Sequence, residues 1–108
     1  MFRLVYPYKK VTTSGGTASF NTRHLHGDLM ALHVKPATST TTWKMAIVGY
    51  NSLSVWDSKQ SGVGETGEQN ILLWSINSVG EVLTVNITSA SADEQFEVEL
   101  RVREYQLR

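Results

Sequence analysis

Apolar and polar residues alternate one by one along much of this chain. The clearest case is residues 96–103, where Phe96, Val98, Leu100 and Val102 alternate with Glu97, Glu99, Arg101 and Arg103. Successive side chains of a β-strand point to opposite faces, so the pattern predicts a half-buried strand with one solvated face. A helix would need apolar residues three and four positions apart, and here they fall out of phase.

Two strands are predicted in the middle of the chain, at residues 29–35 and 41–50. Each carries three apolar residues on one face: Met30, Leu32 and Val34 in the first, and Trp43, Met45 and Ile47 in the second. Pro36 cannot donate a ladder hydrogen bond and a Thr-rich stretch follows it, so the chain is expected to reverse between the two strands. We expect an antiparallel pair at the centre of the sheet, with these apolar faces packed together.

Glycine and polar clusters mark the predicted turns. Gly27 is expected to end one strand, and residues 77–80 are expected to turn between two others. Residues 57–70 contain three glycines and almost no apolar residue, which predicts a surface loop long enough to be a contact surface or a mobile flap. The remaining strands are predicted at residues 17–22, 51–56, 71–77 and 81–88.

Seven to eight short strands predict an all-β fold, a single antiparallel β-sandwich of jelly-roll or immunoglobulin-like topology. Residues 17–108 would form the sandwich. Residues 1–16 would form an N-terminal extended arm or edge strand, because Pro7 disfavours a central strand. The expected core comprises Phe20, Met30, Leu32, Val34, Met45, Ile47, Leu72 or Leu73, Leu83, Val85, Ile87, Phe96, Val98 and Leu100.

Charge and composition narrow the range of partners. The chain has 108 residues, enough for one domain, with ten basic and ten acidic side chains. A formal net charge of zero gives no global attraction for nucleic acid or an anionic membrane. Residues 1–59 carry seven basic and two acidic side chains, and residues 60–108 carry three basic and eight acidic ones. One interpretation is a molecule with a positive and a negative pole that packs head to tail with its own copies. The other is that strands from both halves interleave in the fold, so that the charges mix over the surface.

No cysteine is present, so neither disulfides nor thiolate metal sites are available. The N-terminal residues lack the apolar run and cleavage site of a signal peptide, and no segment is long and apolar enough for a membrane span. We therefore expect synthesis in a cytoplasm and no membrane partner.

The sequence gives little support for a catalytic or metal-binding site. His24 and His26 are spaced to share a strand face, but a zinc site needs at least one further protein ligand, and exposed turn histidines are the simpler interpretation. Glu97 and Glu99 are better explained by a solvated face or cross-strand ion pairs than by glycosidase chemistry. The glycines of residues 61–67 match no nucleotide-binding fingerprint. We predict no catalytic residue, no metal site and no cofactor.

The aromatic residues offer an alternative function. A sandwich that exposes Trp43, Tyr50, Trp56 or Trp74 on one face can stack on sugar rings, as a carbohydrate-binding module does. The competing expectation is that Trp43 and Trp74 belong to the core, because large aromatic residues dominate small cores. Trp56, beside the long glycine-rich loop, is the tryptophan most expected to be exposed.

Two stretches carry a resemblance to a known class of proteins. Residues 33–47, HVKPATSTTTWKMAI, together with residues 83–93, LTVNITSASAD, and the alternating strand after them, resemble small all-β virion proteins of tailed bacteriophages. The resemblance implies a non-enzymatic capsid decoration (cement) protein that binds the major capsid protein or other virion proteins. The alternative that the resemblance allows is a neck, tail, fibre or receptor-binding component of the virion. It also implies a virion location and a homo-oligomer, with a trimer favoured by closed symmetry.

The N-terminal residues are the candidate contact with a neighbour. As an extended arm they would add a strand or an apolar anchor to another protein, as exposed edges readily do. The candidate partner-binding residues are Phe2, Arg3, Tyr6, Tyr8 and Trp56.

Overall fold

A computed structural model describes residues 2–49, 54–57 and 65–105 of the chain. Their regular structure is entirely β and entirely antiparallel, and no helix that could cross a membrane occurs among them. The strands are β1 (Phe2–Val5), β2 (Tyr8–Thr12), β3 (Ala18–Pro36), β4 (Thr42–Val48), β5 (Ser54–Asp57), β6 (Glu65–Thr66), β7 (Gln69–Thr88) and β8 (Gln95–Tyr105).

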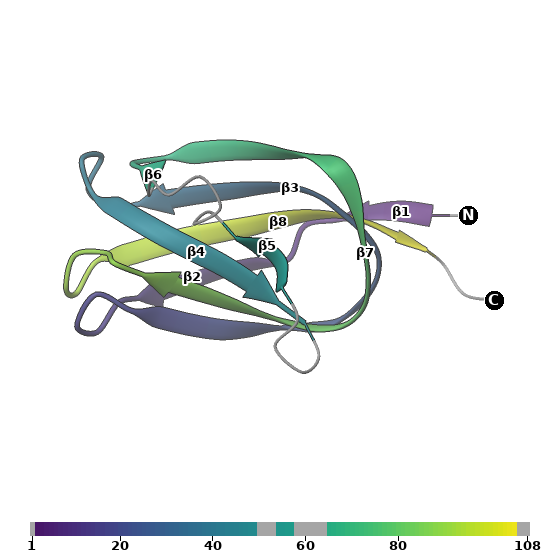
Figure 1. The fold of residues 1–108 in the computed structure, drawn as a ribbon, viewed down its shortest axis with the longest axis horizontal. Coiled ribbons are helices and arrows are strands. Elements are labelled where there is room, and N and C mark those ends of the chain that lie inside the picture. Colours follow the sequence, from purple (N-terminus) through teal and green to yellow (C-terminus); the bar gives the residue numbers. More distant parts are fainter. Residues whose placement is uncertain (1, 50–53, 58–64, 106–108) are drawn as a thin grey trace.

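These strands form a sandwich whose two layers share two long strands. β3 and β7 pair along most of their 19 and 20 residues and curve together from one layer into the other (Figure 1). The β8 layer contains β1, β2, β8, residues 27–36 of β3 and residues 69–79 of β7. The β4 layer contains β4, β5, residues 18–25 of β3 and residues 80–88 of β7. The predicted all-β antiparallel sandwich of seven to eight strands is confirmed.

The curve of β3 and β7 passes through two glycines. Gly80 is opposite His26, and Gly27 is opposite Val79. The Gly27 Cα lies so close to β8 that a Cβ there would collide with the carbonyl oxygen of Arg103. The predicted turns at Gly27 and at residues 77–80 are therefore wrong: both strands bend and continue, because a strand glycine permits a bend or a close backbone approach as well as a reversal.

The predicted central pair is also wrong. β4 hydrogen-bonds to β7, β5 and β6, and its residues are not paired with β3. After Pro36 the chain crosses to the opposite layer, and β8 occupies the position beside β3 that the sequence suggested for β4. The apolar faces of the two segments still meet, because Leu32 and Met45 belong to one buried cluster between the layers.

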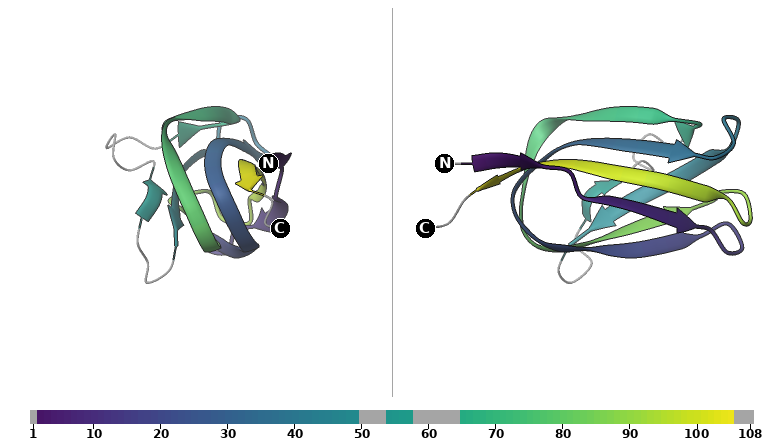
Figure 2. Two further views of the ribbon diagram at one scale, coloured as in Figure 1. Left: turned by 90° about the vertical axis from the view of Figure 1, so that its right-hand side faces the viewer. Right: turned by 180° about the vertical axis from the view of Figure 1, so that it is seen from behind.

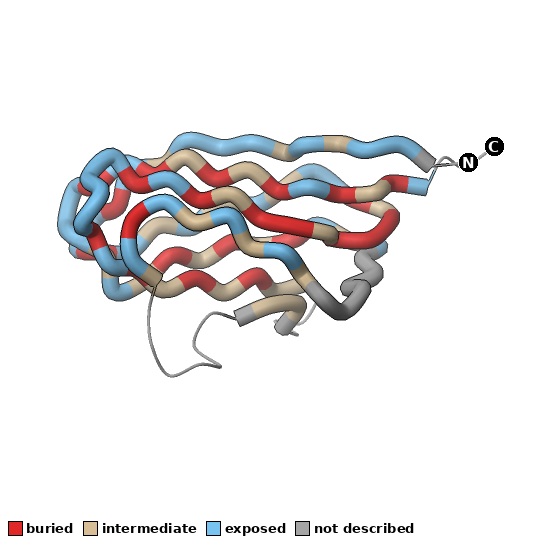
Figure 3. The backbone as a smooth tube through the Cα atoms, turned by 90° about the horizontal axis from the view of Figure 1, so that it is seen from above, coloured by how far each residue is buried: buried red, intermediate tan, exposed pale blue. Residues whose placement is uncertain are grey.

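The core follows the predicted alternation except where β3 is irregular. Buried and exposed positions alternate along the strands in Figure 3. A register shift between Leu29 and Ala31 moves the apolar phase, so Leu29 is buried while Met30 is half-exposed, contrary to prediction. Ten predicted core residues are buried, and Phe20 and Leu73 pack against the cluster. Trp43 is in the core, as one of the two expectations for it held, and the structure adds Leu25, Leu29 and Val102.

The long predicted loop is only partly a loop. Residues 58–64 lie outside the described residues. Glu65–Thr66 form β6, which pairs with Thr42 and Trp43, and Gln69 already begins β7. The sequence does not predict β6 or the start of β7, because an exposed strand made of polar residues has the same composition as a loop. The Thr66, Glu68 and Asn70 side chains are exposed, as expected for a surface.

Candidate functional site

Large apolar side chains are exposed mainly on one surface, the outer face of the β8 layer. Among the described residues, six large hydrophobic side chains are exposed, and five lie on this face: the strand register places four of them there, and contact with Arg101 places Tyr6. They are Leu4 (52% exposed), Tyr6 (48%), Tyr8 (53%), Leu72 (61%) and Tyr105 (42%). The sixth, Val82, belongs to the β4 layer. Concentration on one face, rather than even scatter, is typical of an interaction surface.

The strand register arranges the outer side chains of this layer in rows. One row joins Leu72, Ala31 and Arg101, and the Tyr6 ring lies 5.6 Å from the Arg101 guanidinium carbon. The next row runs through Asn70, His33, Glu99 and Tyr8. A third row joins Lys35, Glu97 and Lys10. Apolar groups thus lie in the first two rows, beside polar and charged ones, and the third row is charged throughout.

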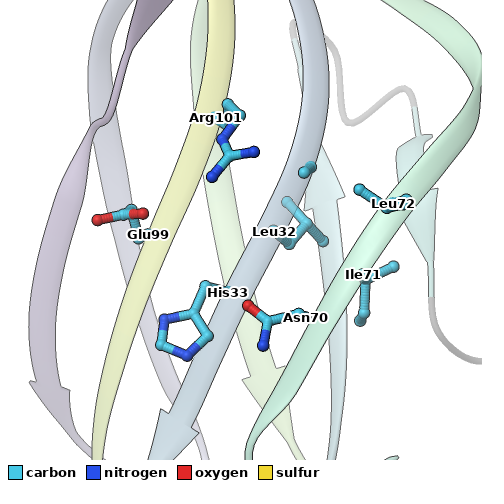
Figure 4. A pocket seen from close by; sticks show the side chains of 8 residues that line it. Leu32, His33, Asn70, Ile71, Leu72, Glu99 and Arg101 are labelled. Atoms are coloured by element: carbon cyan, nitrogen blue, oxygen red, sulfur yellow. The ribbon is translucent and has the colours of Figure 1, made fainter.

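A hollow of about 190 Å³ lies over Ala31 in the first row. The small alanine side chain stands between those of Leu72 and Arg101, so the surface is recessed there. Figure 4 shows the side chains around this hollow, with those of His33 and Asn70 close together at one side. A second hollow of about 280 Å³ adjoins it and shares His33 and Glu99 as lining residues. We call these two hollows together the trough; its lining side chains come from Tyr8, Ala31, His33, Lys35, Glu68, Asn70, Leu72, Glu97, Glu99 and Arg101.

Hydrogen bonds fix two edges of the trough. The Tyr8 hydroxyl donates to Glu97 Oε1 at 2.6 Å, which lowers the pKa of that carboxyl group and raises the pKa of the phenol. His33 Nε2 lies 2.5 Å from Glu68 Oε2. The Tyr8 side chain is thereby held in place, although Tyr8 remains exposed.

The two ends of the described chain form a second feature, which we call the terminal ribbon: β1 paired with residues 102–105 of β8. Figures 1 and 2 show it extending beyond the curve of β3 and β7. β1 is the last strand at this side of the sheet, so its outer backbone edge has no strand partner among the described residues. An unpaired edge of this kind can accept a strand from another chain.

Charged side chains fasten the terminal ribbon to the sandwich. The Arg23 guanidinium donates two hydrogen bonds to the Glu104 carboxylate, at 2.9 and 3.0 Å, and Arg3 lies 3.6 Å from it. The bonds from Arg23 lower the pKa of the Glu104 carboxyl group. Buried Asp28 accepts hydrogen bonds from Arg103 and from the Tyr105 hydroxyl, both at 2.8 Å.

The predicted contact residues separate into two groups. Tyr6 and Tyr8 lie together on the outer face of the β8 layer, and Arg3 is exposed in β1. The backbone of Phe2 pairs with Tyr105, and the Phe2 side chain is not described. Trp56 lies in β5 of the other layer, half-buried against the core, so the structure does not bring it near the tyrosines.

Sequence reasoning missed three members of the exposed apolar set. Tyr105 continues the solvated face of the alternating β8 pattern, and Leu4 alternates with the inward Val5, so both had a signal. Leu72 had none, because its neighbours Ile71 and Leu73 are also apolar. 

The residues proposed for other chemistry lie elsewhere. Trp43 is fully buried and donates a hydrogen bond from Nε1 to the Gly67 carbonyl, which removes it from any sugar-stacking surface. Tyr50 and the Trp74 side chain lie outside the described part of the chain. His24 and His26 are in β3 rather than in a turn. The described residues contain no group of three or more His, Cys, Asp or Glu that could hold a metal ion.

Known proteins resemble this chain in fold but not in sequence. No protein-family model matches it, and no curated protein matches its sequence. A chain of the acidic stable capsid structure of Helicobacter pylori bacteriophage KHP30 is similar, with 6% identity and a TM-score of 0.53 over 95% of this chain and 93% of that one. The similarity shows a shared fold.

Two further structures give lower scores. The carbohydrate-binding module CBM36 in complex with calcium and xylotriose has 10% identity and a TM-score of 0.45, covering 94% of this chain and 99% of that one. The infectious bursal disease virus VP2 subviral particle has 10% identity and a TM-score of 0.41, covering 94% of this chain and 33% of that one.

Proposed function

We propose that this chain is a non-enzymatic virion structural protein, specifically a capsid decoration protein that binds the head of a bacteriophage. The terminal ribbon carries the proposal, because it combines an unpaired strand edge with the exposed side chains of Leu4 and Tyr105, and exposed Tyr6 follows β1 directly along the chain. The fold shared with the KHP30 capsid chain agrees with a role in a virion, as does the resemblance of the sequence to phage virion proteins.

Attachment would use backbone and side chains together. A strand of the major capsid protein or another virion protein pairs with the free edge of β1, and apolar side chains of the ribbon pack against that neighbour. An ordinary stable interface buries about 800 Å² per partner. Repetition over the particle adds the strength of many such contacts, which lets weak copies resist rupture together.

Sedimentation of the native protein through a density gradient, followed with an antibody against this chain, tests the proposal. We expect co-migration with a particle in the megadalton range that persists through a high-salt wash, because the contacts are mainly apolar and backbone-mediated. Recovery only as a free small protein would rule out the virion role.

Variants then test the ribbon itself. Leu4→Glu combined with Tyr6→Ser should reduce binding to particles that lack the native protein by at least tenfold, since both side chains leave the apolar contact. The matched control is Val82→Glu, which changes an exposed apolar residue of the β4 layer. Equal binding by both variants would show that attachment does not use the ribbon.

A further inference from the structure

We propose that the trough on the outer face of the β8 layer is a binding site for a neutral oligosaccharide. The trough lies outside the terminal ribbon, which contains Leu4 and Tyr105. The proposal does not depend on the virion role.

The shape of the trough fits an extended ligand. Tyr8 of β2 and Leu72 of β7 stand on the outermost of four strands, with β8 and β3 between them. Neighbouring strands are spaced about 4.8 Å apart, so the trough crosses on the order of 14 Å of surface. The surface is recessed over Ala31, since Ala31 is 8% exposed and Leu72 beside it is 61% exposed.

Its charge is nearly balanced. Lys35 and Arg101 contribute positive charge, and Glu68, Glu97 and Glu99 contribute negative charge, with Lys10 next to Glu97 in the third row. Lys35 and Lys10 lie on either side of Glu97, and Arg101 follows Glu99 on the outer face of β8, so the surface presents no extended field of one sign. Such a surface gives no general advantage to an anionic or a cationic ligand and suits a neutral, polar one.

Several polar side chains here are available for a ligand. The side chains of Asn70 and Glu99 have no hydrogen bond or ion pair to other described residues, and Arg101 contacts the Tyr6 ring without an ion pair of its own. A carboxylate accepts hydrogen bonds, a guanidinium donates them, and an amide does both. A sugar hydroxyl donates and accepts, so adjacent hydroxyls can satisfy all three groups.

Apolar surface completes the match. The exposed face of the Tyr8 ring and the exposed Leu72 side chain lie at the two sides of the trough. Sugar rings have C–H faces that pack on aromatic and aliphatic groups while their hydroxyls stay hydrogen-bonded, which is the combination that orients ligands in small-molecule sites.

Titration calorimetry of the full chain with neutral cello-, malto- and chito-oligosaccharides, and with an acidic oligogalacturonide, tests the proposal. We expect at least one neutral oligosaccharide to bind and the acidic one to bind more weakly. Ala31→Leu fills the recess and Glu99→Ala removes a hydrogen-bond acceptor, so each should weaken binding about tenfold or more.

Asn21→Ala is the matched control, because Asn21 is an exposed polar residue on the β4 layer. It should leave the affinity unchanged. Circular dichroism of each variant checks folding. If Ala31→Leu disturbs the strand, Glu99→Ala alone provides the test of the trough. No binding of any neutral oligosaccharide at millimolar concentration, preference for the acidic one, or equal affinity in Glu99→Ala would overturn the proposal. These results leave the particle-binding test unaffected, because that test substitutes Leu4 and Tyr6, which do not line the trough.

Discussion

Two glycines lie where this sandwich bends. Gly27 and Gly80 lie in the same curve of β3 and β7, yet their surroundings differ. A Cβ on Gly27 would collide with the Arg103 carbonyl oxygen and lie 2.7 Å from the Glu104 Cα, whereas a Cβ on Gly80 would meet only His26 Cδ2, at 3.8 Å. Gly27 is therefore required by the close approach of β8, and Gly80 is not required by packing.

Gly27→Ala is expected to lower the free energy of unfolding by about 2–4 kcal/mol, because backbone of β3 or β8 must move. Gly80→Ala should change it by less than about 1 kcal/mol, on the stabilising side, since alanine loses less conformational entropy than glycine in a strand. Urea unfolding of both variants measures the difference. Equal effects of the two substitutions would contradict the close approach at Gly27.

At the scale of elements, Glu104 joins three strands. Its carboxylate, in β8, receives hydrogen bonds from Arg23 of β3 and lies near Arg3 of β1. Only 10% of the Glu104 side chain is exposed, so the charged form depends on these partners. The Arg23 bonds keep the pKa of the carboxyl group below its ordinary value in the folded protein.

A lowered folded pKa stabilises the protein above the pKa of an unfolded glutamate, about 4.3, and this stabilisation is lost as the pH falls through the folded pKa. Glu104→Gln should therefore lower the free energy of unfolding by about 1 kcal/mol at pH 7, a small value because Arg23 is exposed and solvent screens its interaction with Glu104. The difference from the native chain should vanish in acid. Urea unfolding between pH 7 and pH 3 measures it. Asp93→Asn, at an exposed carboxylate without an ion pair among the described residues, should show no such convergence.

β4 pairs with β7 and not with β3, although its buried face was predicted correctly. Its inward face of Trp43, Met45 and Ile47 follows directly from alternation. The identity of its neighbour does not, because a strand with a two-residue repeat presents the same apolar face whether it pairs beside β3 or faces it from the opposite layer. The five residues after Pro36 are compatible with either arrangement.

For the whole molecule, the two layers have different outer surfaces. The β8 layer carries the exposed tyrosines and a cluster of charged side chains, and the β4 layer carries uncharged polar residues such as Ser19, Asn21, Thr84 and Asn86, bonded in pairs across β3 and β7. The imbalance of charge between the two halves of the sequence does not become two poles on the β8 layer, because β2, β3 and β8 place Lys10, Lys35, Glu97 and Glu99 side by side.

A decoration protein at a local three-fold position is expected to associate as a trimer. Sedimentation equilibrium of the purified chain should then give three times the chain mass of 12.1 kDa at micromolar concentration. Leu4→Glu should leave this mass unchanged if the ribbon contacts the particle and not a second copy. A monomer at every concentration measured would contradict the trimer and would limit attachment to single-copy contacts.

The sequence by itself determined the local structure. Alternation in β8, in β4 and at the ends of β3 and β7 was enough for the all-β class, the approximate strand number and ten of the buried residues, because side-chain direction in a strand depends only on its own backbone. It also placed Tyr6 and Tyr8 on an exposed segment beside Pro7, where both are found.

The tertiary structure alone decided how distant segments meet. The bends at Gly27 and Gly80, the phase shift after Leu29 and the crossing of β4 depend on contacts between residues far apart in the sequence, chiefly with β8. The trough has the same origin: Ala31, Leu72 and Arg101 are widely separated along the chain, and only the register of three strands brings a small residue between two large ones.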